Sequence, residues 1–200
     1  MASETTRASV HCLHTGPDML TLLLFRHAKS SWDNRDQPDH ERPLNARGRR
    51  AAPLMGRYMD ANGLKPDRVL CSAAVRTQET AALALAEIQG VPAPKLSDAL
   101  YLSAPAKMRA EIAKTPASET SLMVIGHNPG MHELALELAG SGDREARRRL
   151  REKFPTAALA VLFAVTGHAE DWPVAQGGSH AIARALASYL RSLGGEIETG

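Results

Sequence analysis

The chain has 200 residues, of which 44% are hydrophobic and 23% charged, and its formal net charge is +2. This composition indicates one soluble globular domain with a sizeable core, and the small net charge argues against nucleic acid as a partner. Two cysteines, Cys12 and Cys71, without a C-x-x-C pair exclude a disulfide framework, so a reducing compartment is expected.

Strand-like and helix-like segments alternate along the chain after an unpatterned start. We expect residues 1–18 to be a tail and 19–200 to form a single domain. The predicted elements, in chain order, are a strand over Leu20–Arg26, a helix over Ala46–Asn62, a strand over Arg68–Cys71, a helix over Val75–Gln89, a short strand over Lys95–Ala99, a helix over Pro105–Lys114, a strand over Ser121–Ile125, a helix over Pro129–Ala139, a strand over Ala157–Val165 with a partner strand near His168–Val174, and a helix over Ser179–Ser192.

This alternation predicts the fold class. Strands that alternate with helices are typical of an α/β protein with a mostly parallel central sheet. We therefore expect a three-layer α/β/α sandwich. In such a sheet, binding sites form beyond the carboxyl ends of the strands.

Basic side chains follow three of the predicted strands. The first strand ends in Arg26 and His27, the stretch after the second brings Arg76 to the start of a helix, and His127 comes directly before another helix. A satisfied histidine and a capping arginine at a strand end are the structural alternative for each motif alone. Together they would bury much positive charge at one edge, and that favours an anionic ligand such as a phosphoryl group.

Four motifs in one order carry a family resemblance. "RHAKSSW", "ERPLNARGRRAA", "SAAVRTQETA" and "VIGHNPG" resemble the histidine phosphatase superfamily, and more narrowly its SixA-type phosphohistidine phosphatase branch. The similarity runs from about Met19 to Ala139, with weaker support toward the C-terminus.

The resemblance implies a role for each matching residue. His27 would be the nucleophile that becomes phosphorylated, and Arg26 would bind phosphoryl oxygens beside it. Arg42 and Arg76 match the two other phosphate-binding arginines, and His127 matches the second histidine of the pocket. Without the resemblance, Arg42 would be interpreted as an exposed loop arginine.

The general acid is the least defined part of the expected site. Many members of the superfamily place a glutamate after the third strand, and Asp98 in "KLSDALYLS" is the nearest match. An N-cap or turn aspartate is the alternative role for Asp98. Glu79 could instead reach the pocket from the first turn of its helix.

These residues predict a metal-independent phosphatase without a cofactor. The expected substrate is phosphohistidine on a signalling or phosphotransfer protein. A phosphatase of small phosphate esters, such as sugar or nucleoside phosphates, and a non-catalytic module that binds a phosphorylated ligand are the alternatives. A phosphate- or sulfate-type anion should bind in the pocket.

Further expectations concern location and partners. Apolar runs are shorter than the roughly 20 residues of a membrane helix, and no secretory signal is seen, so a cytoplasmic monomer without membrane contact is expected. The basic stretch 143–154 alternates acid with base and lacks aromatics, which is typical of a solvated helical face rather than a nucleic-acid surface.

Overall fold

The computed structural model describes residues 19–165. The strands are β1 (Met19–Arg26), β2 (Arg68–Ser72), β3 (Lys95–Ser97), β4 (Ser121–Gly126) and β5 (Leu159–Val165). The helices are α1 (Ala46–Ala61), α2 (Val75–Leu85), α3 (Pro105–Ile112), α4 (Gly130–Leu138) and α5 (Arg144–Glu152), with short 3-10 turns η1 (Asp39–Glu41) and η2 (Asp98–Leu100). The predicted elements at 168–174 and 179–192 lie outside the described residues.

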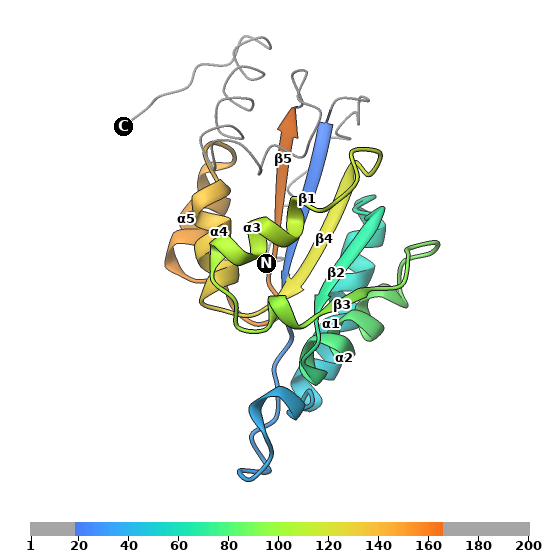
Figure 1. Cartoon of the computed structure of the whole chain (residues 1–200), viewed down its shortest axis with the longest axis vertical. Coiled ribbons are helices and arrows are strands. Elements are labelled where there is room, and N and C mark those ends of the chain that lie inside the picture. The colour runs from blue at the N-terminus through green and yellow to red at the C-terminus, as the bar shows by residue number, and fades with distance from the viewer. Residues whose placement is uncertain (1–18, 166–200) are drawn as a thin grey trace, which may run out of the picture.

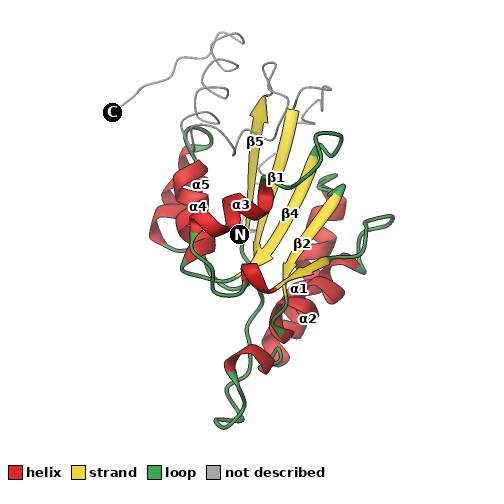
Figure 2. Ribbon diagram, viewed as in Figure 1, coloured by secondary structure: helices red, strands yellow, loops and turns green. Residues whose placement is uncertain are grey.

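The five strands form one sheet in the order β3-β2-β4-β1-β5 (Figure 1). Every pair is parallel except β1 with β5, which is antiparallel with Leu22 opposite Leu162. Helices cover both faces of the sheet (Figure 2). The prediction of a mostly parallel α/β/α sandwich is confirmed.

Alternate residues of β1 face the two layers of helices. Leu22 and Leu24 belong to a core cluster with residues of α3 and α4, whereas Leu23 and Phe25 belong to a second cluster with residues of α1 and α2. All four side chains are buried. Since a strand turns successive side chains to opposite faces, this run of apolar residues is buried on both sides, as in other parallel sheets.

Helix α1 approaches the end of β1 closely enough to fix the segment after it. A Cβ added at Gly48 would lie 2.2 Å from the backbone oxygen of Lys29, so only glycine allows this contact. Asn45 caps the same helix by accepting a hydrogen bond from the Gly48 N–H at 2.9 Å. The segment directly after His27 is therefore held by the start of α1.

Helix α5 carries the basic stretch of the sequence. None of its residues is fully buried, and Glu145 pairs with Arg148 and Arg149 along its surface. The prediction that residues 143–154 form a solvated helical face is confirmed for this helix. Among the described residues, none of the helices has the length and apolarity that a membrane crossing requires.

Candidate active site

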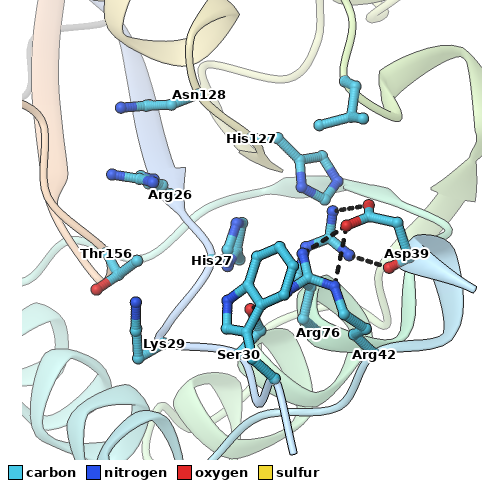
Figure 3. A pocket seen from close by; sticks show the side chains of 12 residues that line it. Arg26, His27, Lys29, Ser30, Asp39, Arg42, Arg76, His127, Asn128 and Thr156 are labelled. Carbon is cyan, nitrogen blue, oxygen red and sulfur yellow. Dashed lines mark hydrogen bonds and ion pairs between the residues drawn. The ribbon is translucent and has the colours of Figure 1, made fainter. Parts of the chain in front are cut away.

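A cavity of about 250 Å³ opens at the carboxyl ends of β1 and β4 (Figure 3). Strand β1 delivers Arg26 and His27, the residue after β4 is His127, and the first turn of α2 delivers Arg76. The cavity is lined by Arg26, His27, Lys29, Ser30, Trp32, Asp39, Arg42, Arg76, Leu102, His127, Asn128 and Thr156. The structure thus brings five of the predicted site residues together, namely Arg26, His27, Arg42, Arg76 and His127.

His27 is buried and has one nitrogen free for chemistry. Its Nδ1 lies 2.7 Å from the backbone oxygen of Ala28, an acceptor, so Nδ1 carries the proton and Nε2 the lone pair. Burial lowers the pKa of His27 to about 4, and the charges of Arg76, Arg26 and Arg42 act in the same direction against the raising effect of the Ala28 hydrogen bond. At neutral pH the imidazole is therefore uncharged, with its lone pair on Nε2.

His127 faces His27, with ring centroids 5.1 Å apart. Its Nε2 lies 2.8 Å from Ser72 Oγ, and its buried Nδ1 has no partner among residues 19–165. We assign the Ser72 hydroxyl as donor to Nε2, which leaves the proton of His127 on Nδ1. Burial lowers its pKa to about 3, with smaller contributions from His27 and Arg76. His127 is thus a neutral hydrogen-bond donor inside the cavity.

Two of the three guanidinium groups at the cavity wall are anchored by backbone oxygens. Arg26 donates from NH1 to the backbone oxygen of Phe154 at 2.6 Å, and Arg76 donates from NH1 to the backbone oxygen of Asp39 at 2.5 Å. The Nε atoms of Arg26 and Arg76 are buried without a partner in the described part of the chain. Buried N–H groups of this kind require an acceptor, and an oxyanion supplies several at once.

Asp39 connects two of these arginines and was missed at the sequence level. Its Oδ1 accepts from Arg42 Nε at 2.9 Å and NH2 at 2.5 Å, and its Oδ2 accepts from Arg76 NH2 at 2.8 Å (Figure 3). The same Oδ2 also accepts from the Tyr101 hydroxyl at 2.6 Å. Although burial acts to raise it, the hydrogen bonds from Tyr101, Arg76 and Arg42 lower the pKa of Asp39 to about 2. The carboxylate therefore stays ionised.

The charges of the cavity favour an anion. Arg26, Arg42 and Arg76 contribute three positive charges and Lys29 a fourth, whereas Asp39 contributes one negative charge. Phosphoryl oxygens match the planar N–H groups of arginine. Within residues 19–165, no group of three histidine, cysteine, aspartate or glutamate side chains is arranged to hold a metal ion.

The structure does not bring the two candidate acids into the cavity. The Asp98 side chain is 92% exposed, lies 4.0 Å from His40 Nε2 and does not line the cavity, because η2 turns it toward solvent. Glu79 accepts from the Leu44 N–H at 2.6 Å and pairs with Arg49 at 2.9 Å. The prediction of Asp98 as general acid therefore finds no support in the geometry, and Glu79 instead anchors the segment that leads into α1.

Six further lining residues were not identified from the sequence. They are Lys29, Ser30, Trp32, Leu102, Asn128 and Thr156. The Arg42 guanidinium lies 3.5 Å from the centroid of the Trp32 ring, and Asn128 donates to the same Phe154 oxygen that holds Arg26. Asn128 follows His127 directly in the "GHNP" motif, which is the one sequence signal that could have indicated it.

Comparisons with known proteins agree on one family. A sequence model of the histidine phosphatase superfamily (branch 1) matches residues 22–121. An uncharacterised protein of Mycobacterium tuberculosis is 42% identical over 150 residues, which span 74% of this chain and 90% of the relative.

Two solved structures are similar over most of the chain. One from Nakamurella multipartitia is 31% identical, with a TM-score of 0.65. The match covers 80% of this chain and 91% of the Nakamurella chain. One from Agrobacterium tumefaciens is 26% identical, with a TM-score of 0.65. The match covers 74% of this chain and 96% of the Agrobacterium chain. Both are provisionally assigned as SixA phosphohistidine phosphatases.

Proposed function

The chain belongs to the histidine phosphatase superfamily, and from that premise we propose that it hydrolyses phosphohistidine on a protein through a phosphorylated His27. One observation carries the choice of substrate. Among the described residues that line the cavity, Asp39 is the only carboxylate, and its pKa of about 2 makes it unable to donate a proton at neutral pH. A substrate with a good leaving group fits such a pocket.

The first step is an in-line displacement at phosphorus. The lone pair of His27 Nε2 forms a bond to phosphorus as the bond from phosphorus to the substrate imidazole breaks. The electron pair of the broken bond stays on the substrate nitrogen. The leaving group departs as neutral imidazole when its distal nitrogen is protonated, because the conjugate acid of imidazole has a pKa of roughly 6.5.

Charge on the phosphoryl oxygens is stabilised by fixed donors. Arg26, Arg42 and Arg76 supply N–H groups, and the Nδ1–H of His127 adds an uncharged donor. Because these groups are anchored before the substrate binds, little reorganisation is needed as the reaction proceeds.

The second step regenerates the enzyme. A water oxygen attacks phosphorus of phospho-His27, the bond to Nε2 breaks, and the electron pair of that bond returns to the imidazole. The water proton is lost to solvent, and inorganic phosphate leaves. Nδ1 keeps its proton throughout through its bond to Ala28.

Leaving-group chemistry separates this proposal from hydrolysis of small alkyl esters. A serine or sugar alkoxide is a poor leaving group and requires a positioned acid. Phosphohistidine requires much less assistance. The SixA assignment of the structure that is 31% identical points in the same direction.

A substrate panel with covalent trapping tests the proposal. Wild-type protein should hydrolyse a histidine-phosphorylated peptide with a higher kcat/KM than a phosphoserine peptide or a sugar phosphate. Rapid quenching should recover acid-labile phosphate on the wild type and none on His27→Ala. A higher kcat/KM for the sugar phosphate would replace the proposal with a small-ester phosphatase, and binding of phosphate without any turnover would make the chain a non-catalytic binding module.

A further inference from the structure

Two exposed apolar side chains line the mouth of the cavity. Trp32 follows β1 and is 66% exposed, and Leu102 lies between η2 and α3 and is 51% exposed. Most large apolar side chains in residues 19–165 are buried, so two exposed ones at the same opening call for a physical explanation.

Leu102 is presented at this opening by a strained backbone. Its φ angle is 44°, a left-handed conformation that costs an L-residue with a side chain about 1–2 kcal/mol. The neighbours on both sides hold it there. The Tyr101 hydroxyl donates to Asp39, and the Ser103 oxygen packs so closely on Gly130 that a Cβ there would lie 2.0 Å away. The fold thus keeps Leu102 outward at an energetic cost.

Trp32 is held over the arginine side of the same cavity. Its ring lies 3.5 Å from the Arg42 guanidinium, a cation–π contact that orients the indole without burying it. A tryptophan with this much free surface beside a charged pocket is typical of side chains that dominate binding energy at protein interfaces.

We propose that Trp32 and Leu102 form a docking rim that binds the polypeptide flanking the phosphorylated histidine of a protein substrate. The inference rests on the proposed function and deepens it, since it assigns the surface that recognises the protein. Leu102 has no side-chain hydrogen-bonding group and Trp32 has only its indole N–H, so the rim offers little to the many hydroxyls of a sugar, whereas both side chains gain from apolar neighbours of the phosphohistidine in a peptide. The rim is continuous with the phosphate pocket, so one substrate can occupy both.

The test compares two substrates that are both cleaved at a P–N bond, one of which carries a peptide and one of which does not. A histidine-phosphorylated peptide with apolar flanking residues offers contacts to the rim, whereas phosphoramidate offers none. For Leu102→Ala and Trp32→Ala in the full chain, the ratio of kcat/KM for the peptide to kcat/KM for phosphoramidate should fall about fivefold or more, mainly through KM for the peptide. Leu54→Ala is the matched control, because Leu54 is 60% exposed on α1 and does not line the cavity.

Each outcome of this test either supports or overturns a specific part of the proposal. An unchanged ratio for Leu102→Ala, with or without a general loss of activity, overturns the rim. Equal losses on both substrates for Trp32→Ala would make Trp32 a residue that only positions Arg42, and would remove it from the rim. A wild-type protein that hydrolyses neither substrate refutes the proposed function itself, and the rim falls with it.

Discussion

Replacing Asp39 with alanine should disturb the two arginines on one side of the phosphate pocket. Arg42 loses both bonds to Oδ1 and keeps its contact with the Trp32 ring and two long hydrogen bonds, 3.3 Å to Ser30 Oγ and 3.4 Å to the Ser31 oxygen. Arg76 loses one bond but keeps the other, because NH1 is bound to the backbone oxygen of residue 39. The change therefore affects Arg42 most.

The magnitude follows from these contacts. Hydrogen bonds between charged groups contribute about 1.5–3 kcal/mol each when buried, and the Asp39 side chain is 43% exposed, so the contacts are discounted for solvent. A loss of about 2 kcal/mol in transition-state stabilisation corresponds to roughly 30-fold in kcat/KM. Removal of the negative charge acts the other way on anion binding, because it leaves Arg42 and Arg76 without their carboxylate partner.

The two effects are separable in one assay. Steady-state kinetics on the histidine-phosphorylated peptide should show kcat/KM reduced about 30-fold for Asp39→Ala, while inorganic phosphate inhibits more strongly than it inhibits the wild type. Asp98→Asn is the charge-matched control from the same region of the surface, since Asp98 does not line the cavity. If Asp39→Ala retains more than a third of the wild-type kcat/KM, the arginines hold their places without this carboxylate and the reasoning fails.

Three further outcomes are expected. Since the pKa of His27 is lowered to about 4, Nε2 stays unprotonated at neutral pH. After correction for ionisation of the phosphate and of the imidazole of the substrate, kcat/KM should stay level down to about pH 5.5 and fall as the pH approaches 4, and a fall centred near 6.5 would contradict this. Ser72→Ala removes the hydroxyl at His127 Nε2 and should lower kcat about tenfold, with ¹⁵N NMR of His127 showing loss of the single Nδ1–H tautomer; an unchanged tautomer would assign that proton differently. Asp98→Asn should change kcat/KM by less than about twofold for both phosphohistidine and alkyl phosphate substrates, and a selective tenfold loss on the alkyl phosphate would restore Asp98 as an acid.

Local patterns predicted the frame of the sheet and the residues at its edge. The strands β1 and β4 are buried apolar runs, and their ends place Arg26, His27 and His127 at the carboxyl edge without any knowledge of distant contacts. Helix ends were less predictable. The predicted helix over 75–89 ends at Leu85, and turns lead from there to Gly90, which has a φ of 68°.

The places of Asp39 and Trp32 in the site depend on long-range contacts, so they could not be predicted, although Trp32 is the last residue of the motif "RHAKSSW". Both lie in a polar segment between β1 and α1 that has no hydrophobic period. Asp39 enters the site only because η1 packs beside α2 and Tyr101 reaches across from the end of η2. For Asp98 the reverse holds: a position that matched a family pattern is turned outward by the backbone of η2.

The charge arrangement links this site to the kind of bond it is suited to break. A carboxylate tied to Arg42, Arg76 and Tyr101 cannot donate a proton at neutral pH, but it holds two cationic donors in place before the substrate arrives. In the proposed mechanism, the pocket thus stabilises charge on the phosphoryl oxygens and offers no carboxylic acid to assist the leaving group. Without assistance from an acid, the rate depends on how easily the leaving group departs. A protonated phosphohistidine meets that requirement far better than an alkyl phosphate does.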